Sequence, residues 1–218
     1  MTVENILFAI EIIGTVAFAI TGVITALEKK FDIFGAIVLG TVTAVGGGIV
    51  RDLILGYTPP MAFRKSVYAI TAVITSLAVF VVAYFFGRRI KKHFDVYSQV
   101  INIFDSIGLS VFVVGGVNSA ISCGFGENMF LSIFVATLTG VGGGVMRDIM
   151  AGRVPKILRK RVYALAAIIG AVIYYLLFYY ELCSATLAII LGAGSVLIIR
   201  ILATIFHWNL PTVDNLDE

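Results

Sequence analysis

A seven-residue motif occurs twice in this chain, each time within a long apolar segment. Gly46 to Asp52 reads Gly-Gly-Gly-Ile-Val-Arg-Asp, and Gly142 to Asp148 reads Gly-Gly-Gly-Val-Met-Arg-Asp. Glycine weakens a helix by about 1 kcal/mol per residue relative to alanine. Charged groups at membrane depth are rare unless they face a protein interior or a water-filled path. Two copies of so unfavourable a motif indicate one shared, functional structure.

The composition places both motifs in a membrane protein. Hydrophobic residues make up 60% of the chain and charged residues 13%, and the mean hydropathy is +1.03. Soluble domains are typically about 45–50% apolar. The first apolar run is long enough to span a bilayer and follows no basic segment, so we expect it to be retained and not cleaved as a signal peptide.

Apolar runs and their interruptions predict an all-α membrane protein with seven transmembrane helices. The second and fifth contain the triple glycines, and a Gly-x-x-Pro sequence follows each, at Gly56 and Gly152. We therefore expect the second and fifth helices to be broken at Gly-Gly-Gly. The expected spans are 5–27, 33–56, 66–86, 97–121, 128–152, 162–180 and 183–206.

The basic residues predict the orientation in the membrane. When the loops are assigned alternately to the two sides, eleven basic residues fall on one side and two, Arg64 and Lys65, on the other. The positive-inside rule then places the N-terminus outside and the C-terminus in the cytoplasm. The eleven are Lys29, Lys30, Arg88, Arg89, Lys91, Lys92, Arg153, Lys156, Arg159, Lys160 and Arg161.

The two motifs belong to a longer internal repeat. The glycines, the Arg-Asp pairs and the prolines match at an offset of 96, the Val-Tyr-Ala triplets at 67 and 162 match at 95, and Glu11 matches Asp105 at 94. Each unit contains three segments, so the second copy is expected to insert upside down. We predict one transmembrane domain, 1–208, with repeat one at 5–86, repeat two at 97–180, an extra helix at 183–206 and a cytoplasmic tail at 209–218.

Each repeat is predicted to hold a cluster of charges. Depth along the segments matches Glu11 to Arg51 near one side of the membrane and Asp105 to Arg147 near the other. Two acids and one arginine per cluster favour a cation path if all ionise, whereas a neutralised pair would fix helix register instead. Both roles are compatible. The predicted cluster residues are Glu11, Arg51, Asp52, Asp105, Arg147 and Asp148.

Glycines and threonines in the second and fifth segments suggest two alternatives. A broken helix frees backbone groups to face a narrow aqueous path, and small residues also let helices approach closely in lipid. We expect Arg200, near the end of the last segment, to extend its charge toward the membrane surface. The candidate residues for an ion path are Gly46, Gly47, Gly48, Gly142, Gly143, Gly144, Thr43 and Thr139.

With these features the chain resembles the prokaryotic trimeric intracellular cation (TRIC) channel family. The resemblance covers about residues 5–206 and rests on the three-plus-three-plus-one arrangement and the paired Gly-Gly-Gly-x-x-Arg-Asp motif. It implies a homotrimer in a prokaryotic plasma membrane, with a pore in each protomer that is lined partly by the second and fifth helices and passes monovalent cations such as potassium. Some relatives carry a glycine-transporter label instead.

Three classes of function are therefore compared. A cation channel is preferred, and a secondary transporter of a small solute such as glycine is the alternative, since inverted repeats serve both. An enzyme is not expected, because the sequence shows no clustered nucleophile or metal-ligand motif. We expect membrane lipid and monovalent cations as partners, and no cofactor, metal or nucleic acid.

Overall fold

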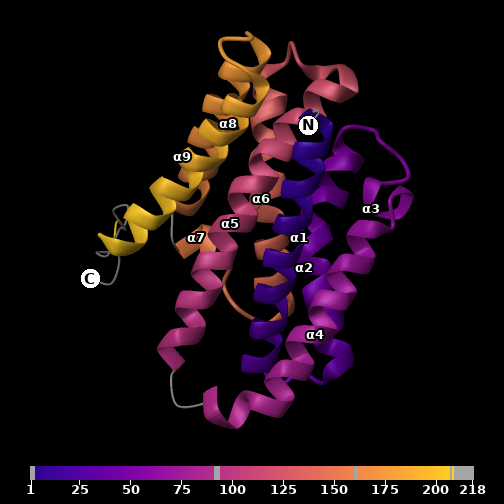
Figure 1. The fold of residues 1–218 in the computed structure, drawn as a ribbon, viewed down its shortest axis with the longest axis vertical. Helices are drawn as coiled ribbons and strands as arrows, with labels where there is room; N and C mark the ends of the chain where they lie inside the picture. The colour runs from indigo at the N-terminus through magenta and orange to yellow at the C-terminus, as the bar shows by residue number, and fades with distance from the viewer. Residues whose placement is uncertain (1–2, 91–93, 160–161, 207, 209–218) are drawn as a thin grey trace, which may run out of the picture.

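The computed structural model describes residues 3–90, 94–159, 162–206 and 208, and within these ranges all regular structure is helical (Figure 1). Seven of the described helices contain a stretch that is long and apolar enough to cross a membrane, as predicted. The predicted tail at 209–218 lies outside the described residues. The elements are α1 (Val3–Glu28), α2 (Ile33–Ile54), α3 (Met61–Arg64), α4 (Val67–Ile90), α5 (Phe94–Ala120), the π-helical turn η1 (Ile121–Phe125), α6 (Met129–Met150), α7 (Lys156–Arg159), α8 (Val162–Tyr179) and α9 (Ala185–Ile205).

The motif helices α2 and α6 begin with equivalent caps. The side chain of Asp32 accepts a hydrogen bond from the N–H of Gly35 at 2.7 Å, and that of Asn128 accepts one from Leu131 at 3.0 Å. Such caps satisfy amide groups that have no partner within the first turn. The local chain chemistry therefore starts both helices at matching positions of the repeat.

The same two helices also end alike. Gly56 and Gly152 adopt positive φ values of 71° and 64°, a conformation that glycine reaches without strain. The N–H after each glycine donates to a carbonyl in the last helical turn, that of Asp52 in α2 and that of Asp148 in α6, both at 2.8 Å. The Gly-x-x-Pro sequences thus mark helix ends, and each leads into a four-residue helix, α3 or α7, that the sequence analysis did not predict.

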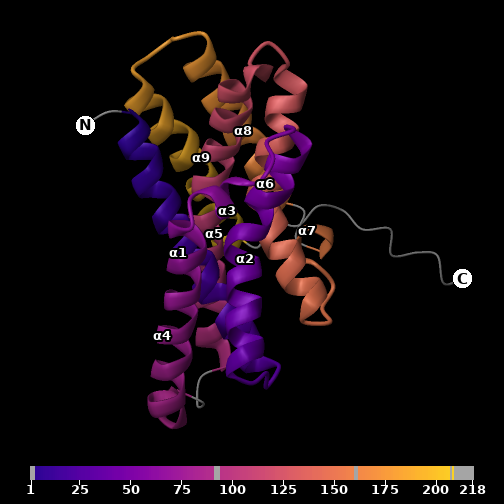
Figure 2. The same cartoon turned by 90° about the vertical axis from the view of Figure 1, so that its right-hand side faces the viewer.

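The two repeats pack against each other, and α2 of the first crosses α6 of the second (Figures 1 and 2). Helix α1 runs away from the end of the bundle that carries the N-terminus, whereas its counterpart α5 runs toward it (Figure 1). Helix α2 packs on both α1 and α6, and α5 packs on α1 and α6. Phe18 of α1 and Phe112 of α5, equivalent by the repeat, meet at a ring separation of 5.2 Å. Helix α9 packs beside α8 and α5.

The expected breaks at the triple glycines are not found, because α2 and α6 both run as continuous helices through them. The glycines instead let the two helices approach closely. A Cβ atom on Gly47 would collide with the carbonyl oxygen of Thr139, and one on Gly143 would collide with that of Thr43. In lipid a helix keeps its backbone bonded within itself, and small residues allow close crossing. The packing interpretation of Gly47 and Gly143 therefore fits the structure.

Candidate functional site

An arginine and an aspartate close the end of α2 in the first repeat. Arg51 donates from Nε to Asp52 Oδ1 at 2.8 Å, and the Nη2 of Arg51 lies 2.7 Å from the same oxygen. The other oxygen, Oδ2, accepts the backbone N–H of Met61 at 2.7 Å. Asp52 therefore ties the end of α2 to the start of α3.

The second repeat reproduces the Nε bond and the backbone bond of this arrangement. Arg147 donates from Nε to Asp148 Oδ1 at 3.0 Å, and Asp148 Oδ2 accepts the backbone N–H of Lys156 at 3.0 Å. We call each Arg-Asp pair, with the N–H that its aspartate accepts, an Arg-Asp clip. The repeated motif thus has a shared structural role, which is to fix the connection from the motif helix to the following short helix.

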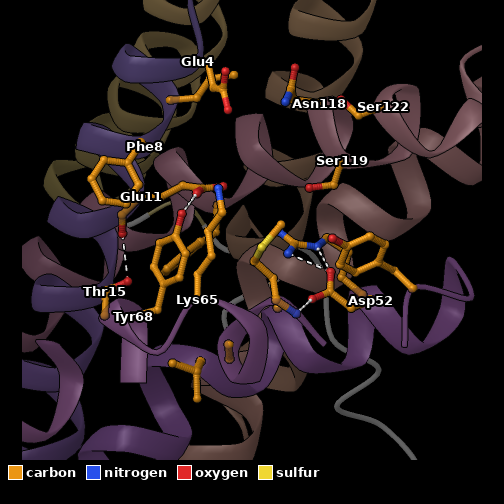
Figure 3. A pocket seen from close by; sticks show the side chains of 18 of the residues that line it. Glu4, Phe8, Glu11, Thr15, Asp52, Lys65, Tyr68, Asn118, Ser119 and Ser122 are labelled. Carbon is orange, nitrogen blue, oxygen red and sulfur yellow. Dashed lines mark hydrogen bonds and ion pairs between the residues drawn. The ribbon is translucent and has the colours of Figure 1, made fainter. Parts of the chain in front are cut away.

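A cavity of about 680 Å³ lies beside the first clip, between α1, α2, α3, α4, α5 and η1 (Figure 3). Asn118, Ser119 and Ser122 lie on the wall opposite Glu11 and Tyr68 (Figure 3). Three carboxylates and two basic side chains line it, so the charged lining has an excess of negative charge. They are Glu4, Glu11, Asp52, Arg51 and Lys65.

Within this cavity Glu11 has a different partner from the one predicted. Its Oε2 accepts a hydrogen bond from the hydroxyl of Tyr68 at 2.5 Å, and no ion pair joins it to Arg51 among the described residues. The physical reason is that Arg51 turns back to Asp52, the next residue, and the long Glu11 side chain reaches α4 instead. Both residues still border the same cavity.

In the second repeat the predicted pair does form. The Nη1 of Arg147 lies 2.8 Å from Asp105 Oδ1 and also donates to Thr21 of α1 at 3.0 Å. The Arg147 side chain is 1% exposed and that of Asp105 is 0% exposed. The second cluster is therefore buried, whereas the first borders a cavity.

Two further basic residues lie at the buried cluster, and the sequence analysis missed both roles. Arg200 of α9, expected near the membrane surface, is buried, and its guanidinium lies 4.6 Å above the ring of Tyr163. The Nζ of Lys156 donates to Asn102 Oδ1 at 3.0 Å. Burial lowers the pKa of Lys156 to about 8, against the opposing influence of Asp105. The repeat itself gave one signal, since Met61 stands where the second copy has Lys156.

The candidate path residues lie at and around the α2–α6 crossing. Gly48 borders the cavity, and a Cβ on Gly142 would lie 3.2 Å from the Cα of Gly47. The hydroxyls of Thr43 and Thr139 donate to carbonyls of their own helices, each at 2.6 Å. Gly46 faces the sulfur of Met146, and Gly144 lies against the hydroxyl of Tyr163. These positions connect the cavity side of the crossing with the buried cluster.

Within the described ranges no group of three or more His, Cys, Asp or Glu side chains is arranged to hold a metal ion. The Arg-Asp pairs are instead bonded to each other and to backbone amides, whereas Glu11 and Lys156 bond to uncharged side chains. The arrangement is suited to ion-pairing and to contact with small charged solutes.

The fold and these two clusters define a class of protein: an integral membrane protein of seven apolar helices, built from two inverted three-helix repeats with one added helix. A protein-family model described as "Glycine transporter" matches this chain twice, over residues 8–84 and 102–179. The two matched ranges coincide with the two repeats.

Bacterial membrane proteins resemble the chain over most of its length. The UPF0126 inner membrane protein YadS of Escherichia coli K12 is 36% identical over 207 residues, which is 95% of this chain and 96% of YadS. The UPF0126 membrane protein YvgT of Bacillus subtilis is 32% identical over 214 residues, covering 93% and 94% of the two chains.

Solved structures give the same assignment. A structure reported as "Structural basis for conductance through TRIC cation channels" has a TM-score of 0.79 and 38% identity, covering 94% of this chain and 95% of its own. The TRIC orthologue from Rhodobacter sphaeroides has a TM-score of 0.83 and 29% identity, covering 94% and 100%. The chain belongs to the prokaryotic TRIC family, to which the glycine-transporter family model also corresponds.

Proposed function

We propose that this protein is a cation channel that conducts monovalent cations such as potassium through a path within each protomer of a homotrimer. The observation that carries the proposal is the acid-lined cavity beside the first Arg-Asp clip, in a fold shared with structures described as TRIC cation channels. A cavity with excess carboxylate raises the local concentration of cations.

The proposed path runs along α2 and α6 from the cavity, past the glycine crossing, to the buried cluster at Asp105 and Arg147. Gly48 borders its wide end. The crossing residues form its constriction, which is closed in this structure because the backbones of α2 and α6 are in contact there. The proposed path residues are therefore those predicted from the sequence, namely Gly46, Gly47, Gly48, Thr43, Gly142, Gly143, Gly144 and Thr139.

We also propose that the cavity faces the cell exterior. The start of α1 and η1, which both border the cavity, lie at one end of the bundle, whereas the turn between α1 and α2 lies at the other (Figure 1). That turn contains Lys29 and Lys30. The excess of basic residues in loops of that second end supports a cytoplasmic location for it.

The neighbours described as channels favour transport over catalysis, and conduction over the carrier alternative. The deciding experiment is a planar-bilayer recording of purified protein under a potassium gradient. Discrete current steps that reverse near the potassium equilibrium potential are expected. Silence in the bilayer, combined with saturable exchange of labelled glycine by the same preparation in liposomes, would instead establish the carrier.

A further inference from the structure

The two charge clusters are equivalent by the repeat but differ in their surroundings. The first contributes Arg51, Asp52 and Glu11 to a cavity of about 680 Å³. The second contains Arg147, Asp148 and Asp105, all buried. The first cluster thus borders a cavity and the second is enclosed by protein, although the Arg-Asp clips are alike.

Arg200 is one residue that distinguishes them. It comes from α9, the helix that lies outside both repeats, so the first cluster has no counterpart of it within the described chain. Arg200 is 3% exposed and lies over the face of Tyr163. Tyr163 is the repeat equivalent of Tyr68, which in the first cluster bonds to Glu11.

Arg200 changes the charge balance of the second, buried cluster. Five charged side chains meet there at neutral pH: Asp105 from α5, Arg147 and Asp148 from α6, Lys156 from α7 and Arg200 from α9. Thr21 of α1 and Asn102 of α5 add uncharged polar partners. Two carboxylates against three basic groups give an excess of positive charge, opposite to the cavity.

The polar groups at this site are incompletely paired. By hydrogen-bond geometry, Asp105 Oδ2, the hydroxyl of Tyr163 and the Nε of Arg200 have no partner within the described chain. The Tyr163 hydroxyl and the charge of Arg200 nevertheless act on Asp105. A buried carboxylate oxygen without a partner is costly and is an acceptor for a cation. Three basic side chains act on Asp105, and two of them, Arg147 and Lys156, already have hydrogen-bond partners. Arg200 is the third.

We propose that the guanidinium of Arg200, a positive charge fixed to the chain, competes with permeating cations for Asp105. It thereby sets the rate and the cation selectivity of conduction past the buried cluster of Asp105, Arg147 and Asp148. The inference rests on the proposed channel function. Its physical basis is that two positive charges near one carboxylate repel each other, so removing the charge of Arg200 raises the occupancy of this site by a permeating cation. Tyr163 positions the guanidinium by cation–π contact.

The experiment measures potassium flux into liposomes and the reversal potential in a KCl gradient for wild type, Arg200→Gln, Arg200→Met and Arg200→Lys. The neutral variants are expected to raise flux roughly tenfold and to increase the preference for potassium over chloride. Arg200→Lys, which keeps the charge, is expected to remain near wild type. A purely structural role would not separate the variants by charge.

Arg64→Gln is the matched control, because Arg64 also lies over a tyrosine, Tyr57, at 4.4 Å but is exposed and is not among the charges that act on Asp105. It should leave flux and selectivity close to wild type. A second control places Arg200→Gln in an Asp105→Asn background, where the proposal expects the gain to disappear.

Each outcome decides the question. If wild type conducts and neither neutral variant raises flux, the competition does not exist. If both neutral variants lose the oligomer size of wild type while Arg200→Lys keeps it, Arg200 is a structural anchor and the proposal is equally wrong. If wild type and every variant pass no cations, the proposed channel function itself is wrong. This result differs from the two above, in which wild type conducts.

Discussion

At the scale of single residues, the Arg-Asp motif has a structural explanation that is the same in both repeats. The arginine bonds to the adjacent aspartate, and the aspartate accepts the first N–H of the short helix that follows. Charge-assisted bonds of this kind are stronger than neutral ones. The sequence predicted that both copies share one structure, and the structure adds what that shared role is.

The third charged residue of each cluster, Glu11 in the first and Asp105 in the second, has a different partner in each, and this allows a first prediction. Asp105 pairs directly with Arg147, whereas Glu11 bonds to Tyr68. A double-mutant cycle of Asp105→Asn with Arg147→Gln should therefore show a coupling energy of about 1–3 kcal/mol. The equivalent cycle of Glu11→Gln with Arg51→Gln should be additive within about 0.5 kcal/mol.

Unfolding by denaturant in detergent micelles measures both cycles, and oligomer size in the same detergent checks assembly. The two cycles control for each other because they alter equivalent positions of the repeat. Strong coupling between Glu11 and Arg51 would mean that these side chains pair in solution, and it would restore the symmetric clusters expected from depth alone.

Lys156 supplies a second prediction, which concerns pH. Burial lowers its pKa from the ordinary 10.5 to about 8 in the folded protein. Between those values the unfolded chain binds more protons, so this residue makes the free energy of unfolding rise with pH from about 8 to about 10.5. The groups that face it are Asn102 and Asp105 on α5, Arg147 and Asp148 on α6, and Arg200 on α9.

Melting temperatures of wild type and Lys156→Met, measured in detergent from pH 7 to pH 10, test this assignment. The difference between the variant and wild type should shift in favour of wild type as pH rises through 8. Met61, the repeat equivalent, shows that methionine is accommodated at this position of the clip. Two curves that stay parallel throughout would contradict a titrating Lys156.

At the scale of elements, the sequence predicted the seven spans and the inverted repeat but not the continuity of α2 and α6. The expected break came from glycine's cost in helices exposed to water. In lipid a freed backbone amide or carbonyl costs more than glycine's low propensity, so the helix persists. Which helix Gly47 and Gly143 contact depends on the packing of distant segments, which no local pattern encodes.

The crossing gives a third prediction. Gly47→Ala and Gly143→Ala each place a methyl group against the carbonyl of a threonine on the partner helix. Overpacking of this kind costs about 1–3 kcal/mol, so both variants should unfold at lower denaturant concentration and show reduced flux. Gly194→Ala is the matched control, because a Cβ there meets nothing within 4 Å in the described structure.

For Gly194 the added methyl group should be neutral or should stabilise α9 by up to about 1 kcal/mol, the difference in helix propensity. The same unfolding measurement in detergent compares the three variants. Wild-type stability of Gly47→Ala and Gly143→Ala would contradict the close packing of α2 on α6 at the crossing.

At the scale of the whole molecule, the sequence predicted part of the candidate site and missed part of it for one reason. The charged motif residues repeat at fixed offsets, so their clustering could be inferred from the chain alone. Arg200 belongs to the helix outside the repeat, and its contact with Tyr163 joins α9 to the adjacent α8. No internal copy exists against which its position could have been compared.

The last prediction concerns the orientation of the bundle in the membrane. The turn between α1 and α2 lies at one end of the bundle, and the turn between η1 and α6 lies at the other (Figure 1). They contain Lys29 and Glu127, and both residues are exposed. In a background with Cys123→Ser and Cys183→Ser, Glu127→Cys should react with an impermeant maleimide on intact cells. Lys29→Cys should react only after permeabilisation, because the basic loops are expected to face the cytoplasm.

The cysteine-free background, which should not label in either condition, controls for other nucleophiles. The reverse pattern would keep the inverted repeat and turn the molecule over, which would place the acid-lined cavity on the cytoplasmic side and the Arg200 cluster toward the exterior. Labelling of both positions from the same side would contradict the arrangement of α1 and α6 itself. The labelling of these two cysteines therefore determines which of the two clusters a cation entering from the cell exterior reaches first.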